Sequence, residues 1–275
     1  MRSVRRGFAL SQRGFQKLRA VSEECSEAYV PATSIRLAWL SVPVGSKKMP
    51  LAVPLSEDDV LDFHISNEEA HADPYWGILW PSSIALSEFL INHPHIVNRK
   101  SVTEIGSGLS LCGLVAASHC NALPVTLLDK QPHCLWCAKR SALALGINES
   151  TVKTHVADWV SANEHDLVEH ELSSKSDVAL ACDVLYEENM ARALGAHILR
   201  FAREELVIAD PLHRKPRHRQ IMLDHLPQHA KLASEIDFHC SAPPAPPSQP
   251  NTPPSSRETN VQSSCAIRIM RISLT

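Results

Sequence analysis

Short apolar segments alternate with helical patterns along most of the chain. Residues 101–105 are β-branched and apolar at alternate positions, which predicts a buried strand. Six similar segments follow at 124–129, 152–156, 177–183, 206–211, 235–240 and 265–274. Between most of these, apolar residues recur every three or four positions, as in helices that bury one face. The alternation predicts an α/β fold with a seven-stranded sheet and helices on both of its faces.

A glycine turn follows the first of these strands. Gly106 and Gly108 permit a tight turn with no Cβ in the way of a ligand. A dinucleotide fingerprint would need a further glycine at position 111, where Leu111 stands. The carboxylate of Glu104, at the end of the strand, would repel a pyrophosphate and attract a cationic amino-acid group. The turn therefore predicts a nucleoside ligand with an amino-acid part, such as S-adenosylmethionine.

Acidic residues close the strands that follow. Asp129 lies 23 residues past the first glycine of the turn, where a ribose-binding carboxylate is expected, although a surface acid at a strand end is the alternative. Asp158 and Trp159 follow the third strand and could bond and cover an adenine ring. Asp183 and Asp210 end the next two strands. The carboxyl ends of parallel strands meet at one edge, so we expect these acids to gather there.

Three aromatic residues precede the glycine turn in a chain that is only 5% aromatic: Tyr75, Trp76 and Trp80. They could stack on an adenine ring or a substrate side chain, or pack in the core, and the sequence leaves both open. Ser82 after Pro81 is expected to cap the next helix.

Composition limits the class of protein. With 275 residues, of which 44% are hydrophobic, the chain can bury one full core. No apolar run approaches the roughly 18 residues of a membrane span, so no membrane partner is expected. Residues 1–50 hold nine Lys and Arg against three Glu, and the remainder holds 18 against 27 acids. An acidic body argues against nucleic-acid binding and suits a basic partner.

The same asymmetry suggests how the chain is divided. We expect a basic segment at 1–50 and a folded domain at 51–275, interrupted by a flexible proline-rich insertion at 242–256. Residues 1–22 are rich in Arg and lack acids, as in a mitochondrial or plastid transit peptide. A disordered head on a cytoplasmic protein is the alternative. The basic loop at 213–218 is interpreted as solvated.

The cysteines do not predict a metal site. Cys134 and Cys137 form a C-x-x-C pair within a helical pattern, and no second pair lies at zinc spacing. We interpret them as two thiols one turn apart and expect no metal.

Four motifs in this order resemble methyltransferase family 16, the seven-β-strand protein lysine methyltransferases. They lie at 74–81, 104–108, 158–159 and 183–186. The Asp-Pro-Tyr-Trp at 73–76 and the Asp-Pro at 210–211 are most similar to the branch that methylates the β subunit of electron-transfer flavoprotein. The resemblance implies a class I methyltransferase fold, Rossmann-like and seven-stranded, with S-adenosyl-L-methionine as cofactor. It implies that the cofactor is lined by Trp80, Glu104, Gly106, Ser107, Gly108, Asp129, Asp158, Trp159 and Cys182. It also implies that Asp183 and Tyr186 hold and orient a lysine amine, so the expected partner is a protein substrate presenting a lysine to a monomeric enzyme.

Two features depart from the family pattern. Ser110 stands where the family usually has a third glycine, so the loop is expected to be slightly tighter, and the proline-rich insertion is unusual. Methylation of a small molecule or another side chain, or an inactive cofactor-binding scaffold, remain alternatives because the cofactor half would look the same. Asp183 as a helix cap with Tyr186 packed in the core is a further alternative.

Overall fold

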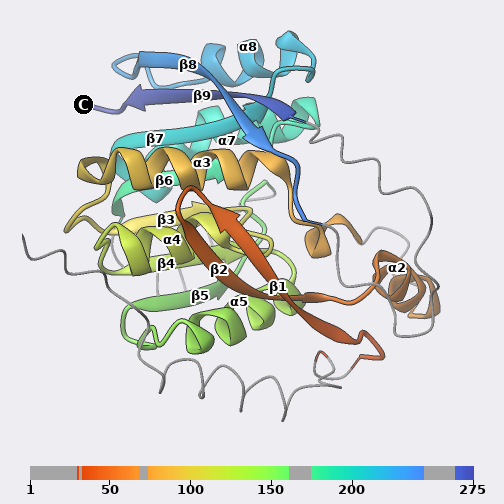
Figure 1. Cartoon of the computed structure of the whole chain (residues 1–275). Coiled ribbons are helices and arrows are strands. Elements are labelled where there is room, and N and C mark those ends of the chain that lie inside the picture. Colours follow the sequence, from red (N-terminus) through yellow and green to blue (C-terminus); the bar gives the residue numbers. More distant parts are fainter. Residues whose placement is uncertain (1–29, 31–32, 68–73, 161–174, 245–263) are drawn as a thin grey trace, which may run out of the picture.

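A single mixed sheet forms the centre of the computed structural model, which describes residues 30, 33–67, 74–160, 175–244 and 264–275 (Figure 1). Its order is β5-β4-β3-β6-β7-β9-β8. The strands are β3 (Val102–Ile105), β4 (Val125–Asp129), β5 (Val152–Val156), β6 (Ser176–Cys182), β7 (Ala202–Pro211), β8 (Lys231–Ser241) and β9 (Ser264–Ser273). Strands β3 to β7 pair in parallel, and β9 runs antiparallel between β7 and β8. The predicted seven-stranded α/β sheet is confirmed.

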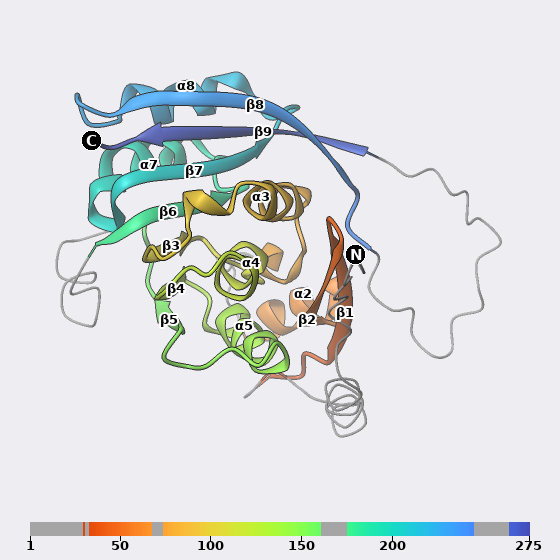
Figure 2. The ribbon, with the colours of Figure 1, turned by 60° about the vertical axis from the view of Figure 1, so that its left-hand side comes forward.

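Helices cover both faces of this sheet (Figure 2). One face carries α3 (Pro81–Asn92), α4 (Leu111–His119) and α5 (Pro132–Ala144), and the other carries α7 (Glu188–Phe201) and α8 (Pro216–Asp224). Strand β6 shows why. Val178 and Leu180 join the core under the first set of helices, whereas Ala179 and Ala181 join the core under the second. A strand apolar on both sides can be buried only between two layers.

A hairpin of β1 (Leu37–Val44) and β2 (Lys47–Pro54) packs outside α5 and belongs to the same hydrophobic core. Val42 and Val44 are fully buried, and the amide of Ala52 donates to Ser141 Oγ of α5 at 2.9 Å. The expected domain start at residue 51 falls inside β2 and is corrected: the fold already includes the first strand of the hairpin. The alternating apolar positions of that strand are consistent with the burial of one of its faces.

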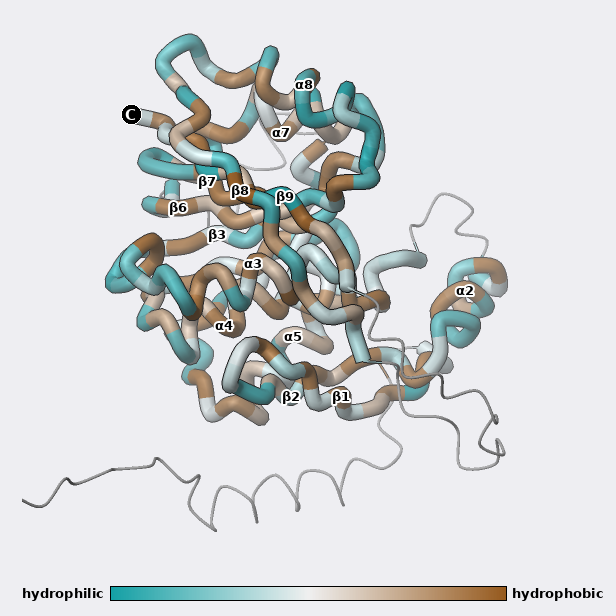
Figure 3. The backbone as a smooth tube through the Cα atoms, turned by 45° about the horizontal axis from the view of Figure 1, so that its top comes forward, coloured by the Kyte–Doolittle hydropathy of each residue, from teal (hydrophilic) through white to brown (hydrophobic). Residues whose placement is uncertain are grey.

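Helix α2 (Glu57–Ser66) lies at the margin of the molecule, and Figure 3 shows hydrophobic and hydrophilic residues alternating along it. Two short 3-10 helices, η1 (Pro74–Gly77) and η2 (Pro94–Ile96), flank α3. Among the described residues, no helix has the length and apolar character needed to cross a bilayer.

Two local predictions are wrong. Ser82 does not cap α3, because the helix begins at Pro81 and its N-cap is Trp80, which makes no capping bond through its side chain. The segment 213–218 is not simply a solvated loop, because α8 begins at Pro216 and His218 is buried. The basic segment 1–22 and most of the insertion at 242–256 lie outside the described residues.

Candidate cofactor and acceptor site

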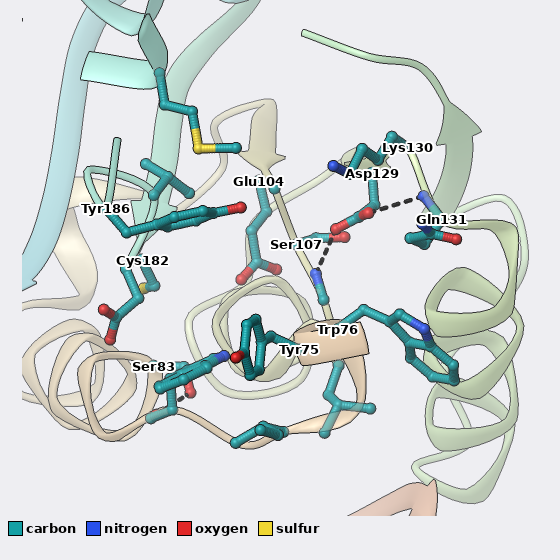
Figure 4. Close-up of a pocket in the computed structure, with 18 of the residues that line it drawn as sticks. Tyr75, Trp76, Ser83, Glu104, Ser107, Asp129, Lys130, Gln131, Cys182 and Tyr186 are labelled. Atoms are coloured by element: carbon teal, nitrogen blue, oxygen red, sulfur yellow. Dashed lines mark hydrogen bonds between the residues drawn. The ribbon is translucent and has the colours of Figure 1, made fainter. Parts of the chain in front are cut away.

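The carboxyl ends of strands β3 to β6 open into one cavity of about 790 Å³ (Figure 4). A volume of this size suits a cofactor together with a substrate side chain. The structure brings every predicted site residue to its wall: Trp80, Glu104, Gly106, Ser107, Gly108, Asp129, Asp158, Trp159, Cys182, Asp183 and Tyr186. Of the strand-end acids, Asp210 alone is outside the wall.

The turn after β3 has the backbone that its glycines predict. Gly106 and Gly108 have φ values of 60° and 49°, and a Cβ on Gly106 would lie 2.9 Å from Val184 Cγ1. Ser110, in place of a third glycine, adopts a φ of 61° and donates its hydroxyl to the Gly108 carbonyl at 3.3 Å. A non-glycine residue therefore holds the left-handed conformation here, at some cost in strain.

The carboxylate of Glu104 lies in the middle of the cavity wall (Figure 4). The residue is only 2% exposed, and the Gly113 amide in the first turn of α4 donates to its Oε2 at 2.8 Å. Burial raises the pKa of Glu104 to about 8, and the Gly113 bond only partly opposes this shift. A cationic ligand group beside this carboxylate would replace the missing solvation.

Asp129 lies at the end of β4, next to the glycine turn. Its Oδ2 accepts from the Gly108 amide at 2.8 Å and its Oδ1 from the Gln131 amide at 2.9 Å (Figure 4). Burial raises the pKa of this carboxyl, and the two backbone bonds oppose the shift. The bonds fix the carboxylate, and each oxygen keeps a second lone pair for a ligand hydroxyl.

Beyond β5, Asp158 and Trp159 complete this half of the cavity. Asp158 is exposed and accepts the Val160 amide at 2.9 Å, whereas the Trp159 indole is buried in the core beside α7. An exposed acceptor beside an apolar ring is the arrangement that an adenine ring requires.

The opposite half of the cavity is formed at the end of β6. Asp183 has a φ of 57°, and its Oδ2 accepts from Ser82 Oγ at 2.7 Å. Its Oδ1 forms an ion pair with Arg214. Burial raises the pKa of Asp183, while the Ser82 hydroxyl and the Arg214 charge favour the ionised form. Tyr186 is 39% exposed and extends its ring toward Glu104 from this side (Figure 4).

The aromatic residues of the 74–81 segment divide between the core and the cavity mouth. Trp76 is buried, donates its indole N–H to His64 Nε2 at 3.2 Å, and turns its ring toward α5 (Figure 4). Tyr75 is 58% exposed, and its ring centroid lies 6.2 Å from that of Trp80. Thus Trp76 packs in the core, and Tyr75 and Trp80 form the outer wall.

Cys182 lines the cavity, and its sulfur atom lies 3.4 Å from that of the buried Cys112. Burial raises the pKa of both thiols. Cys134 and Cys137 are buried on α5. In the described part of the chain, no group of three or more His, Cys, Asp or Glu residues is arranged to hold a metal ion.

A family model described as lysine methyltransferase matches residues 58–227, which contain the whole cavity wall. The chain belongs to this lysine methyltransferase family. The resemblance inferred from the four motifs is confirmed.

Relatives with named activities support the same placement. An electron transfer flavoprotein beta subunit lysine methyltransferase from Homo sapiens is 29% identical over 146 residues, which are 51% of this chain and 50% of that protein. A calmodulin-lysine N-methyltransferase from Arabidopsis thaliana is 29% identical over 157 residues, 56% of this chain and 50% of that protein. The chain therefore spans about half the length of these curated relatives.

One solved structure supports the fold. The structure of SMU.776, a methyltransferase candidate complexed with SAH, matches with a TM-score of 0.50 and 13% identity, covering 71% of this chain and 50% of that chain. This likeness confirms the class I methyltransferase architecture.

S-adenosylmethionine is the cofactor of this lysine methyltransferase family member, and the cavity residues fit it. Ser107 Oγ is buried in the wall and has no hydrogen-bond partner among the described residues, so it can serve a ligand group. We expect Glu104 to hold the cofactor ammonium, Asp129 the ribose hydroxyls, and Asp158 with Trp159 the adenine. On this expectation, we call the wall at β3 to β5 the cofactor half of the cavity and the wall at β6 its acceptor half.

Sequence reasoning missed two residues that hold Asp183: Arg214, which lines the cavity, and Ser82, which is buried behind its wall. Ser82 was interpreted as a helix cap and Arg214 as part of a solvated loop, but both bond Asp183. The signal for Arg214 was weak: it follows Asp210 by four residues, a spacing that allows an ion pair across a turn but does not require one.

Proposed function

We propose that this protein is an S-adenosylmethionine-dependent protein-lysine N-methyltransferase. Family membership supports the proposal, and the observation that carries it is the continuity of the cavity. One space joins Glu104 and Asp129 in the cofactor half to Asp183 and Tyr186 in the acceptor half. A long, narrow amine can approach the cofactor past the exposed aromatic side chains at the mouth.

The protein itself need not form a covalent bond in this reaction. When bound, the cofactor supplies an electrophilic methyl group on a sulfonium, which a neutral amine attacks in line. The residues must orient that amine and exclude water from the attack path. Asp183 and Tyr186 are positioned to accept or donate hydrogen bonds to an amine at the edge of the sheet. The amine of a free lysine has a pKa of about 10.4, so it must lose a proton to solvent before the attack.

The acidic groups favour lysine over arginine as the acceptor. A guanidinium is best held by carboxylates that can accept several parallel bonds. Here Asp183 is already paired with Arg214, and Asp210 is paired with Arg214 and Arg219 outside the cavity wall. A single carboxylate that is already paired with Arg214 is better suited to bind a compact amine than a planar guanidinium with several donors.

The substrate class is a protein, as the names of the two relatives suggest for their own reactions. We infer that the target lysine lies in an exposed segment, because it must cross the aromatic mouth formed by Tyr75 and Trp80. The proposal includes a monomeric enzyme and, if residues 1–22 act as a transit peptide, a mitochondrial or plastid location.

The test uses the full chain with cofactor that carries a labelled methyl group. Purified electron-transfer flavoprotein β subunit, calmodulin and a protein extract are offered in parallel, and labelled residues are mapped by mass spectrometry. Label on a lysine supports the proposal. Label confined to small molecules would favour the alternative enzyme, and cofactor binding without any transfer would favour an inactive scaffold.

A further inference from the structure

Arg214 occupies a position in the acceptor half that its sequence context does not predict. It follows β7, lines the cavity, and exposes only 17% of its side chain. One Nη atom pairs with Oδ1 of Asp183. Its Nε lies 2.7 Å from Oδ1 of Asp210, an ionic contact whose angle falls outside hydrogen-bond alignment.

On the side away from the cavity, buried charged residues hold the Arg214 guanidinium in place. Asp210 is fully buried at the end of β7, and its Oδ2 accepts from Arg219 Nη1 at 2.7 Å. Arg219 also donates to the Pro211 carbonyl at 3.1 Å, which ties α8 to the strand. Two carboxylates and two guanidiniums thus alternate from the cavity into the interior. A buried charge is tolerated when it is paired in this way.

The neighbouring Arg217 provides a contrast on the same segment. Its side chain is 73% exposed and pairs with Glu188 at 3.1 Å outside the cavity wall. An exposed pair of this kind contributes little to stability. Arg217 is therefore the matched control for Arg214: same residue type, same segment, no contact with Asp183.

Asp183 has both oxygens engaged before any substrate arrives. Ser82 donates to Oδ2, and Arg214 pairs with Oδ1. Each oxygen keeps one further lone pair, so the carboxylate can still accept a hydrogen bond from an amine. An adjacent guanidinium favours the ionised carboxylate and opposes its use as a proton acceptor.

We propose that Arg214 is a positioning residue of the acceptor site, which aims the Asp183 carboxylate and selects the neutral amine of the acceptor over its ammonium form. The inference rests on the proposed function. The Arg214 charge offsets the attraction of the Asp183 carboxylate for an ammonium, so a second positive charge is less favoured there than beside an unpaired carboxylate. The lysine proton leaves to solvent, the nitrogen lone pair forms the new bond to the methyl carbon, and the carbon–sulfur bond breaks to leave a neutral thioether.

The other charged and titratable groups around Asp183 do not replace this role. Asp210 on β7 and His213 in the following loop interact with Asp183, and Cys182 precedes it on β6. Glu104, Tyr186 and Glu187 line the same cavity. Arg219 contacts Asp210, and within the described residues Arg214 is the guanidinium in ion-pair contact with Asp183.

Binding of the analogue sinefungin tests the inference without any protein substrate. Sinefungin carries a primary amine where the cofactor carries its methyl group, whereas S-adenosylhomocysteine carries nothing there. The measured quantity is the affinity for sinefungin divided by the affinity for S-adenosylhomocysteine. Calorimetry at neutral pH should show that Arg214→Gln raises this ratio roughly tenfold, because the repelling charge is gone. Arg214→Lys and Arg217→Gln should leave the ratio near the wild-type value. An equal change for both ligands in Arg214→Gln would mean a merely structural role and overturn the inference.

The wild type supplies a second measurement if Arg214→Gln does not fold. A site that selects a neutral amine should bind sinefungin more tightly, relative to S-adenosylhomocysteine, as the pH rises toward the pKa of the amine. A ratio that falls with pH would contradict the inference.

Turnover separates this inference from the proposed function. With a substrate that the wild type methylates, the rise of kcat with pH should move to higher pH in Arg214→Gln and stay in place in Arg217→Gln. A wild type that methylates no protein would count against the proposed function, while the sinefungin ratio would still decide the role of Arg214.

Discussion

Replacing Glu104 with Gln should make the ligand-free protein more stable and its cofactor binding much weaker. The buried carboxyl has a pKa of about 8 against an ordinary value of 4.5, so the folded state holds the proton more tightly than the unfolded chain. As pH rises from 4.5 through 8, the wild type must either keep this proton or bury a charge, and its stability falls. The shift sets an upper limit of roughly 5 kcal/mol on this loss.

The glutamine keeps the packing and loses only the charge. Its side-chain oxygen can still accept the Gly113 amide, which bonds Glu104 Oε2 at 2.8 Å. The cofactor ammonium, however, would meet a neutral amide in a buried position. Removing one partner of a buried charge pair typically costs about 2–5 kcal/mol, which corresponds to roughly a 30-fold to several-thousand-fold loss of affinity.

Two assays check these opposite effects. Thermal unfolding from pH 5 to pH 9 should show that the unfolding temperature of Glu104→Gln increases relative to that of the wild type as pH rises. The exposed control Glu149→Gln should unfold at the wild-type temperature throughout this range. Calorimetry with S-adenosylhomocysteine at pH 7 should show release of about 0.9 proton by the wild type and less by the variant, because Glu104 ionises on binding. An affinity within threefold of wild type, or a stability difference independent of pH, would refute the reasoning.

Three further predictions address other parts of the account. Asp183→Asn, chosen because Asn tolerates positive φ, should lower turnover by about 10²- to 10³-fold in single-turnover assays and leave S-adenosylhomocysteine affinity nearly unchanged; near wild-type turnover would remove Asp183 from the site. Gly113→Ala would place a Cβ in steric overlap with Leu127 Cδ2 and 2.7 Å from Glu104 Oε2, so urea denaturation should show a loss of about 1–3 kcal/mol in the free energy of unfolding, and an unchanged midpoint would contradict this packing. Residues 1–22 fused to a fluorescent protein should direct it to an organelle, and a diffuse cytosolic signal would reject the transit peptide.

The sequence specified the cofactor half of the site more completely than the acceptor half. Glu104, the glycine turn and Asp129 lie within strand–turn–helix units, so local pattern and the rule that parallel strands end at one edge were enough to predict their positions. The structure adds the backbone hydrogen bonds that fix the two carboxylates, from the Gly113 amide to Glu104 and from the Gly108 amide to Asp129.

The acceptor half depends on contacts between segments far apart in the chain. Ser82 and Asp183 are 101 residues apart, and Arg214 reaches Asp183 from a loop 31 residues later. Short-range patterns carry no information on such contacts. For the same reason the basic loop was interpreted as solvated, because its sequence shows the charges but not the buried Asp210 that pairs with one of them.

Transfer of a methyl group to lysine is the central claim, and one measurement tests it most directly. The full chain is incubated with cofactor that carries a deuterated methyl group and with each candidate protein, and the products are digested and sequenced by mass spectrometry. The account predicts the deuterated methyl on the side-chain nitrogen of a lysine, with the signal strongly reduced in Asp183→Asn. A deuterated methyl found only on arginine, on another side chain or on no protein, with the cofactor bound, would contradict it.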